Sequence, residues 1–246
     1  MLGFPAARLR ALAEIEDRHF WFRGRRVLLF RLLAFELRQP HRHILDAGCG
    51  TGRLIADLHA LGHDVAGVDS LPDAVERSRR ACPDAVVREG SATALPFEDQ
   101  SFDGVVALDL LEHVEDDRRA TSELARVVGA GGWLFVSVPA GPSLWSFRDA
   151  AAGHRRRYTR SGFRDLLLGA GFEVERLTAY QFVLYPLLAA TRIAGRKGPA
   201  VRDREERPGT LVNGLLGAVN VTEASLAPFV SWPWGTSLVA VCRKPA

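Results

Sequence analysis

A glycine-rich turn directly after a short apolar run is the part of this sequence with the clearest chemical meaning. Residues 44–52 read Ile-Leu-Asp-Ala-Gly-Cys-Gly-Thr-Gly. Glycines at a strand-to-helix turn let the backbone approach a ligand closely. Asp46 places a carboxylate at the strand end, where it would repel a pyrophosphate and favour a cationic group. Because Arg53 stands where the dinucleotide pattern requires its last glycine, the spacing does not fit a dinucleotide site.

Charge is distributed unevenly along the 246 residues. The net charge of +3 divides into +5 over residues 1–45, −10 over 46–123 and +8 over 124–246. The acidic segment holds the glycine-rich turn and further acids at or just beyond the ends of apolar runs. These acids are Asp46, Asp69, Asp109 and Glu112. Since the carboxyl ends of parallel strands meet at one edge of a sheet, we expect them to converge on one cleft that favours a cationic ligand.

Short β-branched runs alternate with amphipathic patterns from residue 43 onward. Such alternation is typical of βαβ units and a parallel sheet, and therefore of an α/β fold. Strands are predicted at 43–47, 64–68, 85–88, 104–108, 133–138, 173–180 and 237–243. Helices are predicted at 53–61, 72–82 and 116–128. Gly62 and Gly129 are the expected stops of the first and last of these helices.

The chain is predicted to form one domain with two additions to a core. Apolar spacing indicates a helical segment over roughly Pro5–Leu37. Between the last two strands, two apolar patches flank the charged stretch Arg196–Pro208, which predicts helix, exposed loop, helix. Within residues 1–246 the predicted parts are an N-terminal helical segment (1–41), a core (42–180), a helical insert (181–234) and the last strand (235–246).

Several classes of protein are excluded. Three widely separated cysteines argue against a disulfide framework and against a zinc site. Arg8 and Arg10 stand where a secretory signal needs its apolar run. The longest strongly apolar stretch, Phe182–Ala190, is shorter than the roughly 20 residues that span a bilayer. We expect a cytoplasmic protein, at most peripheral to a membrane.

The glycine-rich turn resembles motif I of the class I S-adenosylmethionine-dependent methyltransferases, and the resemblance covers residues 43–139. The matching runs are 65–70 (second strand), 90–97 (adenine loop), 101–106 (fourth strand), 109–114 (cleft-lining segment) and 131–136 (fifth strand). The resemblance implies a Rossmann-like, seven-stranded sheet with helices on both faces. The N-terminal helical segment and the helical insert between the last two strands would be additions to it.

S-adenosylmethionine is the cofactor that the resemblance implies, with S-adenosylhomocysteine as product. Asp69 takes the position of the acid that holds both ribose hydroxyls, whereas Ser91 replaces the family's usual Asp for the adenine amino group with a neutral side chain. In related enzymes an N-terminal aromatic residue and an arginine close over the cofactor. Trp21 with Arg25 or Arg26 match them, and plain helix packing is the alternative. The expected cofactor-binding residues are Trp21, Arg25, Asp46, Gly48, Cys49, Gly50, Asp69, Ser70, Ser91, Ala92 and Leu108.

Two clusters are candidates for the acceptor side of the cleft. His113 matches a family histidine that can act as general base for a hydroxyl or phenol. In the basic loop 153–160, His154, Arg157 and Tyr158 are candidates for holding an acidic or phenolic acceptor, because arginine binds carboxylate and phosphate bidentately. A structural role is the alternative for each.

A metal site is the weaker interpretation of the segment around His113. Asp109, Glu112 and His113 are spaced to share one helical face. A similar segment binds a divalent metal in some O-methyltransferases, including the ubiquinone-pathway enzymes, which this chain partly resembles. We assign no metal, because this ligand set falls short of a full shell.

The sequence predicts an S-adenosylmethionine-dependent methyltransferase that acts on an oxygen or nitrogen atom of a small-molecule or lipid-like acceptor of acidic or phenolic character. The alternatives are an RNA methyltransferase, which is weaker because the basic clusters contain no recognised nucleic-acid-binding module, and a non-catalytic, cofactor-binding regulatory protein. Ordinary packing against the sheet is the favoured role of the apolar insert; an acceptor wall, a dimer interface and a peripheral membrane contact beside Arg192 and Arg196 are the alternatives. A monomer or a homodimer is expected.

Overall fold

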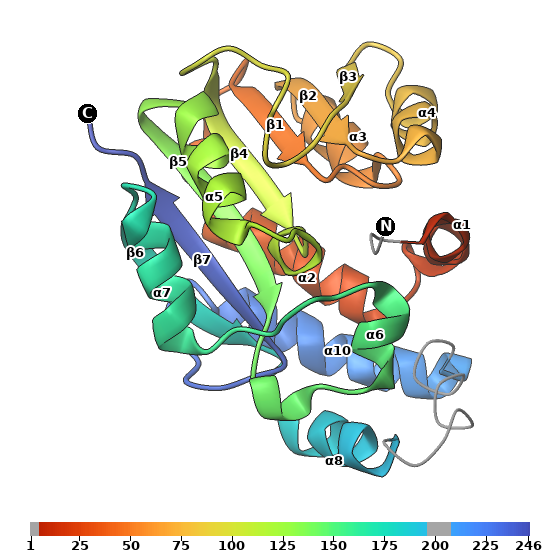
Figure 1. The fold of residues 1–246 in the computed structure, drawn as a ribbon. Coiled ribbons are helices and arrows are strands. Elements are labelled where there is room, and N and C mark those ends of the chain that lie inside the picture. The colour runs from red at the N-terminus through yellow and green to blue at the C-terminus, as the bar shows by residue number, and fades with distance from the viewer. Residues whose placement is uncertain (1–4, 196–207) are drawn as a thin grey trace.

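The computed structural model describes residues 5–195 and 208–246, with a seven-stranded mixed sheet at its centre (Figure 1). The strands are β1 (His43–Ala47), β2 (Asp64–Asp69), β3 (Val86–Glu89), β4 (Phe102–Leu108), β5 (Val128–Pro139), β6 (Glu173–Tyr180) and β7 (Ser237–Arg243). Their order is β3-β2-β1-β4-β5-β7-β6, and only the pairs with β7 are antiparallel. The predicted α/β fold with a seven-stranded sheet is confirmed.

The direction in which the chain winds reverses at β1. β1 pairs with β2 on one side and with β4 on the other, so that Asp46 lies opposite both Gly67 and Val106. From β1 the chain proceeds to one edge through β2 and β3, then returns to the centre at β4. A crevice opens outside the carboxyl ends of the strands at such a reversal, and it is where open α/β sheets bind ligands.

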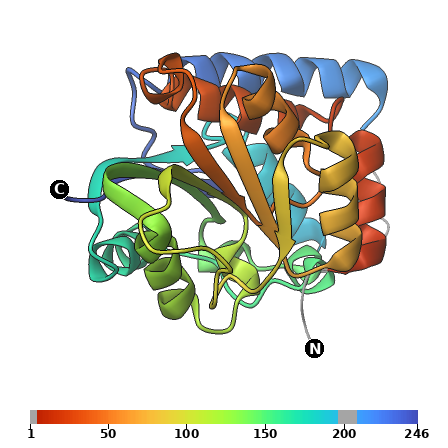
Figure 2. The ribbon, with the colours of Figure 1, turned by 90° about the horizontal axis from the view of Figure 1, so that it is seen from above.

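Helices cover both faces of the sheet (Figure 2). α5 (Asp117–Val127) and α7 (Arg160–Gly169) pack on one face, where Leu124 and Phe163 are fully buried. The other face is covered by α2 (Phe20–Leu32), α3 (Arg53–Ala60), α4 (Pro72–Ala81) and α10 (Thr210–Leu226). The remaining helices are α1 (Ala6–Ile15), α6 (Phe147–Ala152), α8 (Tyr185–Gly195) and the 3-10 turns Glu36–Arg38, Leu111–His113 and Pro142–Leu144.

β5 differs most from its prediction. It begins at Val128 rather than at residue 133, because Val128 already pairs with Phe102 before the register shifts toward Gly104. Gly129 is therefore a strand residue and not a helix stop. The glycines that follow permit this close pairing, since a Cβ on Gly132 would lie 2.8 Å from the carbonyl oxygen of Asp103.

The N-terminal segment, predicted as one helical stretch, forms two helices. α1 ends at Ile15 and α2 begins at Phe20, with His19 as the cap that accepts a hydrogen bond from the N–H of Trp21 (3.2 Å). α2 packs beside α10, whereas α1 lies beside α4 (Figures 1 and 2). The predicted insert contains the two helices α8 and α10, and its charged stretch at 196–207 lies outside the described residues.

α2 packs closely against the sheet and against α10 at a glycine. A Cβ on Gly24 would lie 2.1 Å from Oη of Tyr180 and 2.7 Å from Cβ of Asn220. Tyr180 Oη donates to the carbonyl oxygen of Trp21 (3.2 Å), and Asn220 Nδ2 donates to that of Phe20 (3.4 Å). Side chains from β6 and α10 thus bind the main chain of α2 and fix its position.

Gly24→Ala should destabilise the protein by about 2 kcal/mol, because the added methyl group cannot be accommodated without moving α2. Gly214→Ala in α10 is the matched control: no atom of the described residues lies within 4 Å of its Cβ position, so it should leave stability unchanged or raise it by up to about 1 kcal/mol. Urea denaturation measures both. Equal stabilities of the two variants would contradict this account of α2.

Candidate active site

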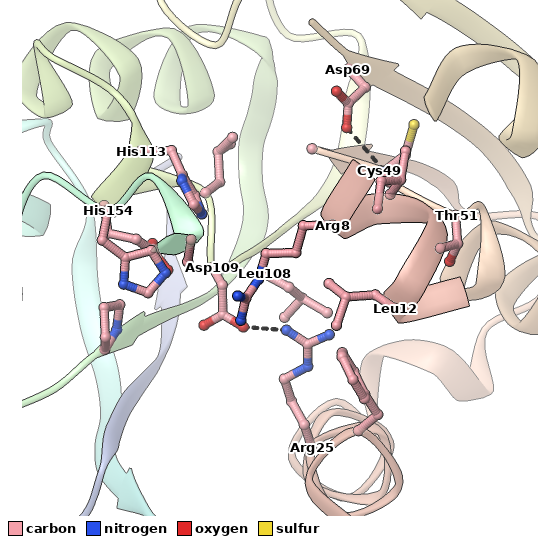
Figure 3. A pocket seen from close by; sticks show the side chains of 18 of the residues that line it. Arg8, Leu12, Arg25, Cys49, Thr51, Asp69, Leu108, Asp109, His113 and His154 are labelled. Atoms are coloured by element: carbon pink, nitrogen blue, oxygen red, sulfur yellow. Dashed lines mark hydrogen bonds and ion pairs between the residues drawn. The ribbon is translucent and has the colours of Figure 1, made fainter. Parts of the chain in front are cut away.

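A cavity of about 530 Å³ opens at the carboxyl ends of β1, β2 and β4, a size typical of small-molecule sites. Figure 3 shows a glycine-loop side, marked by Asp69, and a histidine side, marked by His113 and His154, with the Arg25–Asp109 ion pair between them. The predicted residues that line it are Trp21, Arg25, Asp46, Gly48, Cys49, Gly50, Asp69, Ser70, Ser91, Ala92, Leu108, His113, His154 and Arg157.

The turn between β1 and α3 depends on its glycines. Gly48, Gly50 and Gly52 have φ angles of 79°, 54° and 79°, a region that side chains disfavour. At Gly52 a Cβ would also lie 2.5 Å from the Cα of Ser78 on α4. The Ser78 hydroxyl donates to Sγ of Cys49 (3.3 Å), and burial raises the pKa of the Cys49 thiol above its ordinary value. Cys49 is therefore a neutral thiol held against α4.

Asp69, at the end of β2, is fixed by two main-chain groups. The N–H of Gly50 donates to Oδ2 (3.0 Å) and the N–H of Leu71 donates to Oδ1 (2.9 Å). Burial raises the pKa of Asp69, and these hydrogen bonds act against that rise. Because each carboxylate oxygen can accept a further hydrogen bond, Asp69 can receive two ligand hydroxyls in a fixed orientation. Ser70 follows it on the cavity wall.

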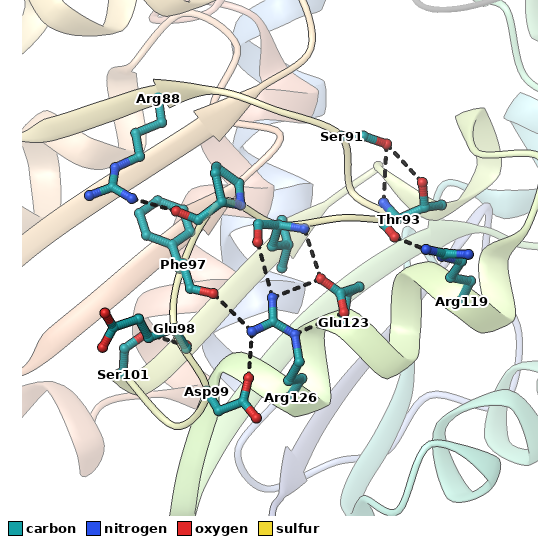
Figure 4. Close-up of polar contacts among 12 residues, drawn as sticks. Arg88, Ser91, Thr93, Phe97, Glu98, Asp99, Ser101, Arg119, Glu123 and Arg126 are labelled. Carbon is teal, nitrogen blue, oxygen red and sulfur yellow. Dashed lines mark hydrogen bonds and ion pairs between the residues drawn. The ribbon is translucent and has the colours of Figure 1, made fainter.

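The loop between β3 and β4 is held by Arg126 of α5 (Figure 4). Arg126 Nη1 donates to the carbonyl oxygen of Phe97 (2.8 Å) and Nη2 donates to that of Leu95 (3.0 Å). Ser91 and Ala92 line the cavity at the start of this loop. Ser91 Oγ accepts a hydrogen bond from the main-chain N–H two residues further on (3.2 Å), so its hydroxyl is oriented although it is exposed.

Carboxyl groups gather where β1 and β4 end. Asp46 and Glu112 are 3% and 0% exposed, and burial raises the pKa of Asp46 to about 7 and that of Glu112 well above its ordinary value. Arg25 of α2 forms an ion pair with Asp109, and its charge also lowers the pKa values of Asp46 and Glu112. The Arg25 guanidinium lies 4.4 Å from the ring centroid of Trp21. Arg25 thus interacts electrostatically with three carboxyl groups.

Asp109 does not share a helical face with Glu112 and His113, so the expectation from their spacing is wrong. Asp109 lies before the 3-10 turn with a φ of 50°. Its Oδ1 accepts from the hydroxyl of Ser137 (3.1 Å) while Oδ2 pairs with Arg25. Its carboxylate is therefore bound by β5 and α2, and Asp109 is not part of the group of possible metal ligands in the described residues.

Glu112, His113 and His154 are the residues that the fold brings together instead. One possible ligand atom from each lies within 4.8 Å of the others, and the two imidazole rings meet edge to face. Neither carboxylate oxygen of Glu112 has a hydrogen-bond partner among the described residues. Burial, with the nearby His154, lowers the pKa of His113 to about 4. This group can bind a polar substrate atom or a cation.

A capping box at the start of α6 positions His154. The main-chain N–H of Ser146 donates to Oδ2 of Asp149 (2.8 Å), and Asp149 Oδ1 accepts from His154 Nδ1 (3.0 Å) and Arg157 Nε (2.8 Å). Burial raises the pKa of Asp149, but the hydrogen bonds from His154 and Arg157 outweigh it and hold the pKa below its ordinary value. With Nδ1 donating, Nε2 of a neutral His154 is an acceptor; it lies 3.9 Å from Glu112 Oε1.

Two of the residues predicted to bind the methyl acceptor, Tyr158 and Arg157, form hydrogen bonds within the protein. Tyr158 does not line the cavity: it is buried in the core and its hydroxyl donates to Asp117 (2.9 Å). Burial, with Asp117, raises the pKa of that hydroxyl. The expectation that Tyr158 faces the acceptor is wrong, because its bridge to Ala140 directs the ring toward α5. Arg157 lines the cavity, but it binds Asp149 and the carbonyl oxygen of Ala140 (2.9 Å).

Two parts of the cavity wall are absent from the sequence prediction. α1 contributes Leu9, and its C-cap residue Glu16 accepts a hydrogen bond from the hydroxyl of Thr51 in the glycine-rich turn. Arg192, expected on an exposed lipid-binding surface, lines the cavity, as does Gln181. The apolar spacing of α1 and α8 indicates helices with a buried face, but no motif distinguishes a cavity from a core.

Comparison with known proteins decides the family. A model described as a methyltransferase domain matches residues 45–136. A protein of Mycolicibacterium smegmatis named a probable S-adenosylmethionine-dependent methyltransferase is 34% identical over 178 residues, which are 70% of this chain and 67% of that protein. The chain belongs to the S-adenosylmethionine-dependent methyltransferases. A relative of the same description from Mycobacterium tuberculosis is 32% identical over 165 residues, 66% of this chain and 59% of its own length.

The methyltransferase fold extends over nearly the whole chain. A Haloferax volcanii protein, solved in complex with a methyltransferase activator, superposes with a TM-score of 0.63 over 98% of this chain and 95% of its own. The identity of 18% supports the fold alone.

S-adenosylmethionine fits the charge and shape of this methyltransferase cavity. Its ribose offers two hydroxyls to an acid that can accept two, Asp69. Its sulfonium and ammonium groups suit the buried acids around Asp46. The positive φ at Gly48 leaves the backbone open to close approach. Arg25, predicted to pair with the cofactor's carboxylate, already pairs with Asp109 and would be shared between the two.

Asp46→Asn should raise the free energy of unfolding of the methyltransferase without ligand, by roughly 2 kcal/mol at pH 8. The pKa of Asp46 is about 7 in the folded protein, against an ordinary value of 3.8 in the unfolded chain. Between those pH values the folded state binds more protons than the unfolded state. The free energy of unfolding therefore falls as pH rises from about 4 to 7. The variant should lose this part of the pH dependence. Urea denaturation at pH 6 and pH 8 measures it.

The control is Asp64→Asn, at the exposed amino end of β2. It should keep the stability difference of the wild type between the two pH values. If Asp46→Asn shows the same difference as Asp64→Asn, the buried charge of Asp46 is not the cause.

Proposed function

We propose that this methyltransferase moves a methyl group from S-adenosylmethionine to an oxygen or nitrogen atom of a small-molecule or lipid-like acceptor of acidic or phenolic character. The observation that carries the proposal is that one cavity reaches from the glycine-rich turn to His154, whose Nε2 is left as an acceptor by the bond to Asp149. When bound, S-adenosylmethionine supplies an activated methyl group on a sulfonium sulfur. The chain orients the two molecules, excludes water and accepts a proton.

On the glycine-loop side, Asp69 binds the ribose hydroxyls, because its oxygens keep acceptor capacity beyond their main-chain hydrogen bonds. Ser91 and Ala92 border the adenine, where Ser91 offers a neutral hydrogen bond. Trp21 and Arg25 close this side from α2. These assignments follow from which groups face the cavity and from the chemistry of the cofactor.

On the histidine side, His154 acts as general base. The acceptor's O–H or N–H proton passes to Nε2 of His154 as the acceptor atom gains the methyl group. Asp149 is a positioning residue: it holds Nδ1 and stabilises the imidazolium that forms. His113 lies edge-on to His154, and a pKa of about 4 keeps it neutral at pH 7, so it provides a polar wall rather than a second positive charge.

The arginines of the loop 153–160 favour a small acceptor over RNA. Arg155 Nε donates to the carbonyl oxygen of His113 (3.2 Å), and Arg156 donates to that of Glu115 (2.7 Å) while pairing with Asp117 (2.8 Å). The basic loop is therefore bound to the protein's own carbonyl and carboxylate groups. Phosphates of a nucleic acid would have to compete with these partners.

For a lipid-like acceptor, we place the membrane contact on α10 and the segment after it. Leu211, Leu215 and Phe229 are 77%, 62% and 82% exposed. In the described part of the chain, no helix is long and apolar enough to cross a bilayer. Arg192 lies in the cavity, so its charge should not govern lipid binding.

Leu215→Asp should abolish co-sedimentation of the protein with phosphatidylcholine vesicles, because the charge would interrupt the exposed apolar surface. Arg192→Met should bind vesicles as the wild type does. If Leu215→Asp binds as the wild type does, α10 is not a membrane contact.

His154→Gln should lower the rate of methyl transfer by about 100-fold or more, since a side chain without a basic nitrogen cannot take the acceptor's proton. The assay follows labelled methyl groups from S-adenosylmethionine into extract fractions that contain lipids, RNA or small metabolites. Cofactor affinity, measured by calorimetry, should stay within about twofold of the wild type, because His154 lies on the other side of the cavity from Asp69.

His59→Gln, on the surface of α3, is the matched control and should leave the rate unchanged. Label that enters RNA alone would contradict a small acceptor, and an unaltered rate in His154→Gln would contradict the general base. A chelator tests the remaining alternative, a metal-dependent enzyme. If the chelator abolishes activity and Mg²⁺ or Mn²⁺ restores it, a metal would be assigned to Glu112, His113 and His154.

A further inference from the structure

Arg192 is a charged side chain in the cavity to which the proposed mechanism gives no role. It projects from α8, which Leu184 and Leu188 hold against Phe20 of α2. Its Nε is buried without a partner, and Arg192 forms no hydrogen bond or ion pair with residues 5–195 or 208–246. Arg192 as a whole is half-buried, and partial burial of a guanidinium is costly unless an anion compensates it.

Among the described residues, the charged side chains near Arg192 do not supply a carboxylate that pairs with it. Burial, together with the positive charges of Arg157 and Arg148, lowers the pKa of Arg192 to about 10. Asp149 acts in the opposite direction, but its Oδ1 already accepts from His154 and from Arg157. Arg192 thus stays protonated at neutral pH, with the nearby carboxylate shared among other donors.

Gln181 adds a second donor without a partner to the same cavity. It is 2% exposed and has a φ of 64°, which a residue with a side chain adopts only when its surroundings require it. Its Oε1 accepts from the hydroxyl of Thr236, whereas its Nε2 has no hydrogen-bond partner in the described part of the chain. Arg192 and Gln181 both present donors to the cavity, so a ligand group that satisfies either of them must be an acceptor.

We propose that Arg192 forms an anion subsite on the histidine side of the cavity and binds a carboxylate or phosphate group of the methyl acceptor. The inference rests on the proposed function, because it assigns the anion to the acceptor. Carboxylate and phosphate share the oxygen pairs that a guanidinium binds bidentately. Arg192 holds one end of the acceptor, and His154 takes the proton from the atom to be methylated.

The cofactor's own carboxylate is the competing occupant, and the arrangement of charge argues against it. On the glycine-loop side, the cation Arg25 lies beside the acids Asp46 and Asp109, and Arg8 also lines the cavity there. On the histidine side, Asp149 balances Arg157 while Arg192 remains in excess. A cofactor of net positive charge is attracted to the first side and an anionic acceptor to the second.

The test measures binding of matched anionic and neutral probes to the full chain by calorimetry, with and without saturating S-adenosylhomocysteine. Benzoate is paired with benzamide, and phenyl phosphate with phenol. At least one anionic probe should bind the wild type about tenfold or more tightly than its neutral partner, and the probe that does so distinguishes a carboxylate from a phosphate subsite. Arg192→Met, which keeps the apolar length of the side chain, should abolish this preference.

Arg31→Met, in which an exposed arginine of α2 is replaced, is the matched control and should keep the preference. The melting temperature of Arg192→Met should equal or exceed that of the wild type, because an unpaired buried charge is removed. Equal binding of anionic and neutral probes by the wild type, or an anion preference retained in Arg192→Met, would overturn the subsite. So would a loss of S-adenosylhomocysteine affinity in Arg192→Met with no change in anion binding.

Failure of the wild type to bind S-adenosylmethionine would contradict the proposed function instead. The anion preference measured without S-adenosylhomocysteine would still decide whether Arg192 forms the subsite.

Discussion

Burial of carboxyl groups at the ends of β1, β2 and β4 is the constraint on which the rest of the structure depends. Parallel strands that end at one edge bring Asp46, Asp69 and Asp109 into one crevice, where burial raises the pKa of Asp46 to about 7. The sheet itself supplies no cation to this crevice. Arg25 of α2 supplies one, through its ion pair with Asp109, and α2 can do so because Gly24 lets it pack closely. The N-terminal helices therefore lie where they can bring a cation to the buried carboxyl groups.

The two additions to the core serve the two sides of the cavity. The segment before β1 contributes α1 and α2, which bring Leu9, Trp21 and Arg25 to the glycine-loop side. The insert between β6 and β7 contributes α8, which brings Arg192 to the cavity. We propose that the sheet provides the cofactor site through its turn and strand ends, and that the additions determine which acceptor enters. Differences in acceptor among methyltransferases of this fold are therefore expected to arise in such additions.

The parts of the site that depend on local geometry could be predicted from the sequence. Gly48 and Gly50 have the positive φ angles that the spacing of the turn implies, and Asp69 lies where the second strand ends. Ser91 and Ala92 line the cavity because their loop follows a strand directly. In each case the residue's position within a strand or turn fixes which of its groups face the cavity.

The residues whose positions were predicted wrongly have a different physical cause in common. Their positions depend on contacts between elements that are distant in sequence. Tyr158 turned out to be a core residue, since its backbone bridge to Ala140 sets the direction of its ring. Asp109 left the predicted helical face because its carboxylate is attracted to Arg25, 84 residues earlier. Arg192 entered the cavity because α8 folds back against α2. A single sequence gives the amphipathic spacing of such helices but not the partner that each one meets.

We infer that buried carboxyl groups in excess of their cations form the cofactor site. Proton release on binding tests it most directly, measured at pH 7 by calorimetry in two buffers that differ in ionisation enthalpy. The account predicts that S-adenosylmethionine displaces protons from the site, chiefly from Asp46, whereas S-adenosylhomocysteine, which lacks the sulfonium charge, displaces fewer. Equal release by the two molecules, or none by either, would contradict it.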